Sequence, residues 1–573
     1  MLPLLRIENL TVEFHNNETV TRALNGISFS VNRGEIMALV GESGSGKSVS
    51  SLSVLRLLPT PPARYKTGSI LFSRDGQQAE DLLQKNKREL QAIRGNQIAM
   101  IFQEPMTSLN PVLTCGDQVM EALLLHRKLD PAEAKKQVTG WFEKVKLPDP
   151  VSVFSRYPHQ LSGGQKQRVM IAMAMCCEPD LLICDEPTTA LDVTVQKTIL
   201  GLIKELQQQT GMGVIFITHD LGVVAEIADR AAVMYRGDIV ESGPVNELFT
   251  RPVHPYTKAL LACRPVNHQR GERLPVVSDF MESGNKKAAV KTSQLNQSNA
   301  TDSGPAPLLE VRDLSVWFPQ AKNFLGRVKS WNKAVDQVSF DLVEGETLGL
   351  VGESGCGKTT LGRALLRLIE PVSGSIHYKG RDLRTMPRKE LQPLRREIQI
   401  IFQDPYSSLN PRLSIGAAIA EPMKVHRLFT SEKQRKDKVV ELLEKVDLKA
   451  AHSNRYPHEF SGGQRQRVVI ARALSLAPSF IVCDESVSAL DVSVQAQVLN
   501  LLNELKKEFG FSVIFISHDL SVVRYISDRI MVMNRGQIEE SGPADTVYFS
   551  PRSAYTRKLI DSVPKGLPDS SRL

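Results

Sequence analysis

The sequence predicts an α/β protein in which one domain architecture occurs twice in tandem. First, GESGSGKS at 41–48 and GESGCGKT at 352–359 both match the phosphate-loop pattern Gly-x-x-x-x-Gly-Lys-Ser/Thr. Second, each copy stands between a short apolar strand, Ile36–Val40 or Thr347–Val351, and a helical pattern, which is the context that such a loop requires. Third, a chain of 573 residues is too long for one hydrophobic core.

Five further segments recur in the same order in both halves, and such a repeat decides the architecture. Equivalent residues stay in register to within one position after the glutamine segment, whereas the first half is longer between its phosphate loop and that glutamine. The pairs are IFQEPMTSLNP at 101–111 with IFQDPYSSLNP at 401–411, YPHQLSGGQKQR at 157–168 with YPHEFSGGQRQR at 456–467, LLICDEPTTALDV at 181–193 with FIVCDESVSALDV at 480–492, FITHDL at 216–221 with FISHDL at 515–520, and MYRGDIVESGP at 234–244 with MNRGQIEESGP at 533–543.

Each half opens with a strand pattern. Apolar and polar residues alternate over 6–14 and again over 308–318, which is typical of a half-buried antiparallel strand. Between the halves, the segment after residue 263 is rich in Asn, Ser, Lys, Gly and Gln and lacks the apolar residues that offset ordering entropy, so it predicts a flexible linker. We therefore expect a first domain over 1–263, a linker over 264–307 and a second domain over 308–573.

Composition and charge exclude several classes of protein. A hydrophobic share of 42% and a charged share of 23% are those of a globular protein, and a net charge of +8 without clustered basic runs does not predict nucleic-acid binding. That charge is compatible with docking near an anionic membrane, although a solvated surface explains it as well. The longest apolar stretch, Val169–Cys177, is far shorter than a membrane span, and the N-terminus does not read as a signal peptide. We expect a cytosolic protein that reaches membranes only through partners.

The cysteine pattern does not predict a metal centre. The seven cysteines are scattered and form neither a C-x-x-C pair nor a ligand set with histidine. We therefore expect reduced thiols, with no zinc and no iron–sulfur cluster.

The two glycine loops predict nucleotide binding. Their glycines let backbone N–H groups point at phosphate oxygens, and the helix that follows adds positive potential. Lys47 and Lys358 are expected to reach the β- and γ-phosphates, and the hydroxyls of Ser48 and Thr359 are expected to bind Mg²⁺. The other expected loop contacts are Gly41, Glu42, Ser43, Gly44, Ser45, Gly46, Gly352, Glu353, Ser354, Gly355, Cys356 and Gly357.

Two carboxylates end an apolar strand in each half. The strand delivers Asp185 and Asp484 to the carboxyl edge of a sheet, where α/β folds bind ligands, and we expect these residues to hold the metal. The adjacent Glu186 and Glu485 can act as general bases on the attacking water. A strand followed by solvated acids is the simpler reading, but recurrence of both acids at one register weakens it.

A histidine and a glutamine accompany each acid pair. His219 and His518 each end a β-branched strand, and their register after the carboxylates favours contact with the γ-phosphate over a structural role. Gln103 and Gln403 are uncharged donors and acceptors suited to ligating Mg²⁺ or the lytic water. A glutamine alone in a loop would indicate nothing.

The Ser-Gly-Gly-Gln runs are the most discriminating pattern. Glycines ahead of an Arg-containing helical segment form a second anion-binding helix N-terminus in each half. Two anion sites in one half would be redundant unless they face different nucleotides. The residues are Ser162, Gly163, Gly164, Gln165, Ser461, Gly462, Gly463 and Gln464.

Together these segments resemble the ATP-binding-cassette (ABC) ATPases over nearly the whole chain, twice over. The resemblance implies tandem P-loop NTPase domains, each with a RecA-like α/β core, an antiparallel β subdomain and a helical subdomain. It also implies that the cassettes close head-to-tail, with ATP and Mg²⁺ between the phosphate loop of one half and the Ser-Gly-Gly-Gln run of the other. Asp192 and Asp491 would lie in the loops that cross between the halves. Phe14 and Phe318 match the position that stacks on adenine, although each could equally be strand core.

Three departures separate the halves. Ser486 stands where the first half has Pro187, Phe460 replaces a leucine, and Cys356 replaces Ser45 in the second loop. Both glutamates are present, so we expect two hydrolytic sites whose rates can differ.

Within this family, two stretches resemble the importers of peptides and nickel. They are the SLNP run after each glutamine and HPYTKALL at 254–261, which the second half matches only as SAYTRKLI at 553–560. The helical insertions at about 111–156 and 411–455 would then receive the pore subunits. The segment 212–230 and the DESVSALDVS variant are most similar to the fused ATPases of glutathione importers, and next to those of microcin C and oligopeptide importers.

The resemblance implies an ATP-hydrolysing importer subunit with two transmembrane permease subunits and, through them, a periplasmic solute-binding protein. It would work on the cytoplasmic face of the bacterial inner membrane and need no homodimer for its ATP sites. Two other classes carry tandem or paired cassettes: ribosome-bound translation factors, which have a long charged helical connector, and DNA-repair ATPases, which bring zinc pairs or coiled coils. Neither feature stands in this sequence.

Overall fold

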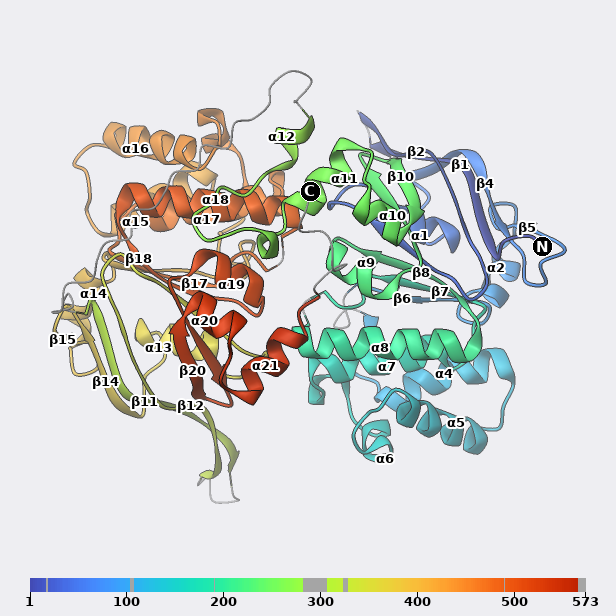
Figure 1. Cartoon of the computed structure of the whole chain (residues 1–573), viewed down its shortest axis with the longest axis horizontal. Coiled ribbons are helices and arrows are strands. Elements are labelled where there is room, and N and C mark those ends of the chain that lie inside the picture. Colours follow the sequence, from blue (N-terminus) through green and yellow to red (C-terminus); the bar gives the residue numbers. More distant parts are fainter. Residues whose placement is uncertain are drawn as a thin grey trace.

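The computed structural model consists of two halves with the same architecture, side by side (Figure 1). It describes residues 1–16, 19–103, 108–189, 191–281, 307–322, 328–488 and 490–564. Each half contains one six-stranded sheet and one four-stranded sheet, flanked by helices. This confirms the predicted tandem α/β fold.

The six-stranded sheets form the nucleotide-binding cores. Their strand orders, β10-β9-β3-β8-β7-β6 and β20-β19-β13-β18-β17-β16, are the same, and all neighbours are parallel except the last hairpin. The central strands are buried because helices cover one face of each sheet, while the four-stranded sheet of the same half and one helix cover the other, which explains their continuous apolar runs. The strands are β3 (Ile36–Val40), β6 (Ile98–Ile101), β7 (Leu181–Asp185), β8 (Gly213–Thr218), β9 (Arg230–Tyr235), β10 (Asp238–Pro244), β13 (Thr347–Val351), β16 (Ile398–Ile401), β17 (Phe480–Asp484), β18 (Ser512–Ile516), β19 (Arg529–Asn534) and β20 (Gln537–Pro543).

The four-stranded sheets are antiparallel, with the orders β2-β1-β4-β5 and β12-β11-β14-β15. The patterns at 6–14 and 308–318 lie in β1 and β11, as predicted. The strands are β1 (Leu5–Asn16), β2 (Thr19–Val31), β4 (Ala63–Phe72), β5 (Glu80–Asp81), β11 (Leu309–Lys322), β12 (Val328–Leu342), β14 (Ser373–Tyr378) and β15 (Arg381–Asp382).

Helices fill the insertion after the glutamine in each half. Thr114 and Ser414 cap the first insertion helices, and Asp130 followed by a proline starts the second helix of the first half. The insertion helices are α4 (Cys115–Arg127), α5 (Pro131–Lys144), α6 (Pro150–Phe154), α15 (Ile415–Val425) and α16 (Glu432–Lys445), with the 3₁₀ turn η3 (Ala450–Asn454).

The remaining helices pack on the sheets and at the interface between the halves. None of the helices that the structure describes is long and apolar enough to cross a membrane. They are α1 (Lys47–Val54), α2 (Lys87–Ile93), α7 (Gly163–Met175), α8 (Val193–Thr210), α9 (Leu221–Ile227), α10 (Val245–Thr250), α11 (Pro255–Ala262), α12 (Val277–Met281), α13 (Lys358–Leu365), α14 (Arg388–Leu394), α17 (Gly462–Leu474), α18 (Val492–Phe509), α19 (Leu520–Ile526), α20 (Ala544–Phe549) and α21 (Ala554–Asp561), with the 3₁₀ turns η1 (Pro158–Gln160), η2 (Pro265–Asn267) and η4 (Pro457–Glu459).

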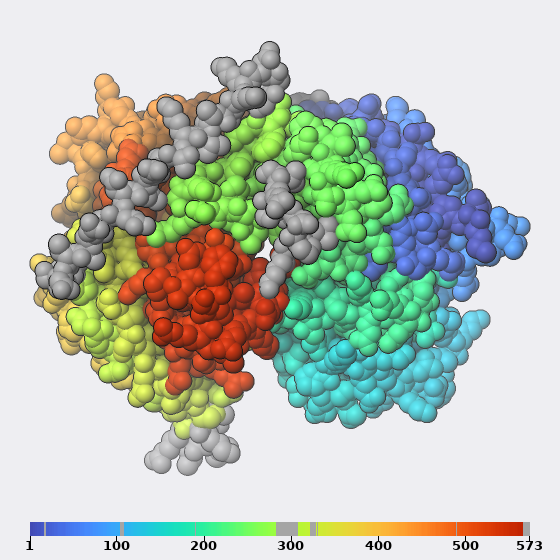
Figure 2. Space-filling model, in the orientation of Figure 1, coloured from blue at the N-terminus to red at the C-terminus, as the bar shows by residue number. Residues whose placement is uncertain are grey.

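Residues 264–281, which belong to the expected linker, cross from the first half onto the second (Figures 1 and 2). Leu274 is fully buried in the core of the second half. The side-chain amide of Asn500 accepts the Leu274 N–H at 2.9 Å and donates to the Leu274 carbonyl at 2.8 Å. The burial of Leu274 and these two hydrogen bonds help to hold the polar segment on the second half, which its composition does not reveal. The other residues of the expected linker, 282–306, lie outside the described part of the chain.

Candidate functional site

The glycine loops run from the buried ends of β3 and β13 into α1 and α13. Gly46 and Gly357 precede the loop lysines with φ angles of 105° and 113°, a region that disfavours other residues. A Cβ atom at Gly46 would come within 2.9 Å of the Ala23 carbonyl, and one at Gly357 within 2.0 Å of the Ala334 carbonyl. These two glycines therefore let the backbone turn its N–H groups inward.

The loop lysines fold back over their own loops. Lys47 Nζ donates to the carbonyl oxygens of Gly41 at 2.7 Å and Glu42 at 2.9 Å. Lys358 makes the same two bonds in the second loop, at 2.8 and 2.9 Å. Burial lowers the pKa of Lys47. Each ammonium thus stands at the centre of a loop, where phosphate oxygens could replace the carbonyl partners.

A carboxylate faces the first helix hydroxyl in each half. Ser48 Oγ donates to Asp185 Oδ1 at 3.1 Å, and Thr359 Oγ1 donates to Asp484 Oδ1 at 2.9 Å. Burial raises the pKa of Asp185 to about 6, and it raises that of Asp484 as well. Hydroxyl and carboxylate oxygens are the ligands that Mg²⁺ prefers, and a cation would favour these buried carboxylates in their charged form, so the residues fit this metal.

Glu186 is held in place from three sides. Its carboxylate accepts hydrogen bonds from Gln103 Nε2 at 3.0 Å and Thr189 Oγ1 at 2.9 Å, and its other oxygen lies 3.3 Å from His219 Nδ1. Burial opposes ionisation, but His219 and Thr189 outweigh it and hold the pKa of Glu186 below its ordinary value. Burial likewise opposes protonation of His219, and Glu186 outweighs it, so the pKa of the imidazole is raised. The sequence did not single out Thr189.

Glu485 has a similar environment, but fewer side chains hold its carboxylate. Gln403 Nε2 donates to Glu485 Oε2 at 2.8 Å, and His518 Nδ1 lies 3.6 Å from the same oxygen. Ser488 occupies the position of Thr189, but its buried hydroxyl has no hydrogen-bond partner among the described residues. Burial again opposes ionisation, and His518 outweighs it, so the pKa of Glu485 is lowered. The structure therefore brings the predicted acid, glutamine and histidine together in each half.

The Ser-Gly-Gly-Gln runs begin helices, as predicted. The hydroxyls of Ser162 and Ser461 cap α7 and α17 by accepting the N–H of Gln165 at 3.3 Å and Gln464 at 3.4 Å. The third residue of each run packs closely on the next helix, since a Cβ at Gly164 would meet Val195 Cγ1 at 2.7 Å. Within the described ranges, no hydrogen bond or ion pair joins either run to the opposite phosphate loop.

The phosphate loops instead contact the loops of the opposite half that contain Asp192 and Asp491. Ser43 donates its N–H to Asp491 Oδ2 at 2.9 Å, and Ser354 donates its N–H to Asp192 Oδ1 in the reciprocal contact. The adjacent loop glutamates accept hydrogen bonds from the first turns of the opposite helices: Glu353 from Thr194 Oγ1 at 2.8 Å, and Glu42 from Ser493 Oγ. Each phosphate loop therefore faces the other half, and sequence reasoning had not indicated Thr194 or Ser493.

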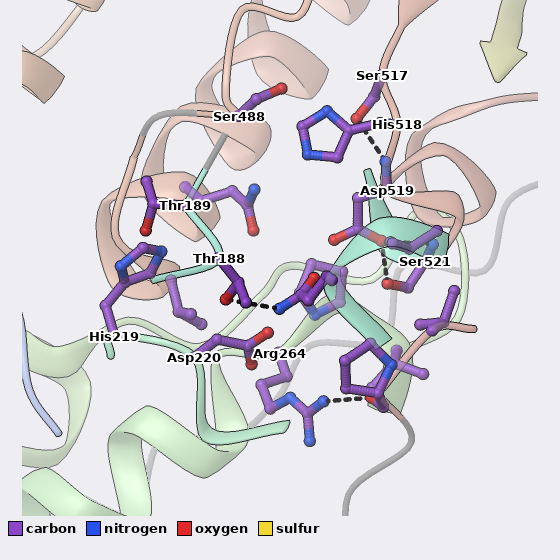
Figure 3. Close-up of a pocket in the computed structure, with 18 of the residues that line it drawn as sticks. Thr188, Thr189, His219, Asp220, Arg264, Ser488, Ser517, His518, Asp519 and Ser521 are labelled. Carbon is purple, nitrogen blue, oxygen red and sulfur yellow. Dashed lines mark hydrogen bonds between the residues drawn. The ribbon is translucent and has the colours of Figure 1, made fainter. Parts of the chain in front are cut away.

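A cavity between the halves lies beside both histidines (Figure 3). His219, Asp220 and Thr189 line it from the first half, and His518 and Asp519 line it from the second. The histidines of the two candidate sites thus lie at one shared cavity.

The two candidate adenine-stacking residues differ in exposure. Phe14 in β1 is partly buried and packs against the core of the first half. Phe318 in β11 keeps 39% of its surface exposed. Either ring lies on the four-stranded sheet of its half, and a stacking role stays a prediction for both.

Two phosphate-loop domains that present paired acids, a glutamine and a histidine, and that face each other through reciprocal loop contacts, define a tandem ATPase. The family model described as "ABC transporter" matches residues 24–189 and 335–488. The model described as "Oligopeptide/dipeptide transporter, C-terminal region" matches residues 240–284 and 540–572. The chain belongs to the ABC transporter family and is an ATPase of this type.

Proteins from several bacteria are similar in sequence to almost the whole chain. A protein of Escherichia coli strain K12 named "Glutathione import ATP-binding protein GsiA" is 50% identical over 573 residues, which are 99% of this chain and 90% of its own length. Proteins of the same name from Salmonella choleraesuis and Pectobacterium atrosepticum are each 49% identical, over 99% of this chain and 90% and 91% of their own lengths. A dimeric ATP-binding cassette solved in a post-hydrolysis state with ADP and Pi is 27% identical and covers 41% of this chain and 98% of its own, with a TM-score of 0.38.

Proposed function

We propose that this chain is the ATP-hydrolysing subunit of an importer that takes up glutathione or other small peptides through separate membrane subunits. The observation that carries the ATPase role is the doubled arrangement of Glu186 with Gln103 and His219, and its counterpart around Glu485. The similarity to glutathione import ATP-binding proteins supports glutathione as the cargo. The matching C-terminal region supports oligopeptides as the alternative.

The carboxylates of Glu186 and Glu485 act as general bases on the attacking water. Their lowered pKa values keep them ionised at neutral pH, and the glutamine and histidine partners orient them. The oxygens of Ser48 and Asp185, with Gln103, would hold Mg²⁺ in the first site, and Thr359, Asp484 and Gln403 would do so in the second. When bound, this ion neutralises negative charge on the phosphates.

Each ATP lies between the two halves in this proposal. The reciprocal contacts of Ser43 with Asp491 and of Ser354 with Asp192 support that arrangement, because they bring each phosphate loop against the opposite half. The first site then combines the loop at 41–48 with Ser461–Gln464, and the second combines the loop at 352–359 with Ser162–Gln165. One chain completes both sites, so no homodimer is needed.

The partners in this proposal are two transmembrane permease subunits and, through them, a periplasmic solute-binding protein. ATP closes the halves, and hydrolysis reopens them, which moves the permeases as rigid bodies. The helical insertions that contain α4–α6 and α15–α16 offer the contact surface. The chain would then be a peripheral protein on the cytoplasmic face of the inner membrane.

Co-purification and uptake test the proposal together. The tagged full chain, expressed in the bacterium from which it comes, is expected to copurify with two membrane proteins, and these cells are expected to accumulate labelled glutathione. A Glu186→Gln/Glu485→Gln variant is the matched control, which should copurify but not support uptake.

Each other outcome assigns a different function. Uptake of labelled di- or tripeptides without glutathione would select the oligopeptide alternative. Copurification with ribosomes and no membrane protein would overturn the importer and favour a translation factor.

A further inference from the structure

In each half, a tyrosine from the C-terminal region touches the phosphate loop. The N–H of Glu42 donates to Tyr256 Oη at 3.0 Å, and the N–H of Glu353 donates to Tyr555 Oη at 3.2 Å. The two tyrosines hold equivalent places, as the second residue of α11 and of α21. Neither hydroxyl has a part in the hydrolysis chemistry described above.

The first hydroxyl is held rigidly. Tyr256 is fully buried, and its ring centroid lies 4.4 Å from that of Tyr235. The carboxylate of Glu241 anchors the start of α11 by accepting the N–H groups of Val253 at 2.8 Å and His254 at 3.0 Å. His254 Nδ1 in turn accepts the N–H of Tyr256 at 3.1 Å. The hydroxyl therefore moves only if α11 moves.

The second half repeats this anchoring with other residues. Glu540 accepts the N–H groups of Arg552 at 2.8 Å and Ser553 at 3.0 Å, and Ser553 Oγ accepts the N–H of Tyr555 at 3.2 Å. Serine thus does here what His254 does in the first half. The recurrence of the contact on a changed sequence indicates that the geometry, and not one side chain, is what the fold maintains.

The tyrosines engage the loop at its entry. In the first loop, the N–H of Glu42 goes to Tyr256, and the N–H of the next residue, Ser43, goes to Asp491 of the other half. The carboxylate of Glu42 accepts a hydrogen bond from Ser493, also of the other half. The loop entry is thus held from both sides.

We propose that Tyr256 and Tyr555 are positioning residues that fix the phosphate loops for ATP. ATP affinity at each site then depends on the C-terminal region of the same half, which links that region to the nucleotide. The inference rests on the proposed ATPase function. A lost buried hydrogen bond would let the loop entry relax, which weakens binding without touching the general base.

The test is a Tyr256→Phe/Tyr555→Phe variant of the full chain, which removes both hydroxyls and keeps both rings. We expect the KM for ATP to rise about tenfold while kcat stays within about twofold, since one lost hydrogen bond is worth about one factor of ten. The Kd of a non-hydrolysable ATP analogue, measured by equilibrium dialysis, should rise by the same factor. Thr257→Val is the matched control, because this neighbouring buried hydroxyl has no hydrogen-bond partner among the described residues.

An unchanged Kd in the tyrosine variant would overturn the inference. An equal rise in Thr257→Val would overturn it as well, since any change in α11 would then suffice. The analogue Kd separates this result from the proposed function: wild-type chain that binds the analogue but does not hydrolyse ATP would refute the ATPase role alone.

Of the single variants, Tyr256→Phe should raise the Kd more than Tyr555→Phe, because its bond is shorter and its ring fully buried.

Discussion

The two candidate ATP sites share their backbone geometry and differ in how firmly the general base is held. Glu186 has Gln103, Thr189 and His219 around it, whereas Glu485 has Gln403 and a more distant His518. The distance from imidazole to carboxylate grows from 3.3 to 3.6 Å between the halves.

The source of this difference lies in the turn after the acid pair. The first half has proline and threonine there, and the second has Ser486 and Ser488, whose buried hydroxyls have no hydrogen-bond partner among the described residues. The two halves thus share the positions of these acids, glutamines and histidines and differ in the hydrogen bonds around them. The second site has its glutamate, glutamine and histidine, but fewer hydrogen bonds hold its glutamate. We therefore expect the first site to hydrolyse ATP faster.

Removal of the general bases should have the largest effect. We expect Glu186→Gln/Glu485→Gln to lower ATP turnover by about 10²- to 10⁴-fold, because the amide cannot accept the proton of water. In single variants, Glu186→Gln should cost more than Glu485→Gln if the first site is the faster one. Steady-state phosphate release measures both. Undiminished turnover in the double variant would refute the general-base role, and equal losses in the singles would break the comparison.

The crossing segment 264–281 offers the next largest effect. Asn500 makes two hydrogen bonds with the backbone of Leu274, whereas Gly201 at the equivalent position of α8 has no side chain to make them. Asn500→Ala should lower the free energy of unfolding by about 2–5 kcal/mol, because two buried backbone groups lose their partner.

Urea denaturation of the full chain measures that loss. Gln497→Ala on the same helix is the control, since this side chain accepts a hydrogen bond from Arg467 Nη2 at 2.9 Å within the second half. Similar losses in the two variants would argue against a specific role of the crossing segment.

Removal of the hydroxyl beside each general base should have a smaller effect on ATP turnover, and the effect should differ between the two sites. We expect Thr189→Val to lower turnover by about three- to tenfold, because Glu186 loses a hydrogen bond that helps keep it ionised. Ser488→Ala in the second half should leave turnover unchanged, since this hydroxyl has no partner among the described residues. Phosphate release by the two variants decides the matter, and equal effects would show that the hydroxyls do not cause the asymmetry.

The smallest expected effect is a difference in thiol reactivity between the two phosphate loops, since Cys356 stands where the first loop has Ser45. Burial raises the pKa of the Cys356 thiol, so little thiolate forms at neutral pH, and its reaction with N-ethylmaleimide should be slow and should accelerate as pH rises through that pKa. Bound ATP should protect it, and only the second site should lose nucleotide. Labelling followed by mass spectrometry reports the site. Full inhibition of Cys356→Ser by the same reagent would point to another cysteine.

Much of the fold and most of the candidate site were predictable from sequence patterns. Glycine loops, apolar strands that end in acids, and a glutamine and histidine in register were visible because each depends on residues adjacent in the chain. Thr189 was not singled out, because a threonine in a turn has no pattern of its own. The contacts of residues 264–281 with the second half were not predictable, since composition reports the lack of apolar residues but not the burial of Leu274 in the core of the other half.

The sequence by itself determined that this protein has two nucleotide-binding domains, where each phosphate loop lies and which acids accompany it. Local rules suffice for these features, because a strand, a turn and a helix place their residues whatever the rest of the chain does. Only the tertiary structure decided which residues meet across long separations: Ser43 with Asp491, Leu274 with Asn500, and Tyr256 with Glu42. These contacts depend on how packed elements come together, and no spacing in the chain encodes them.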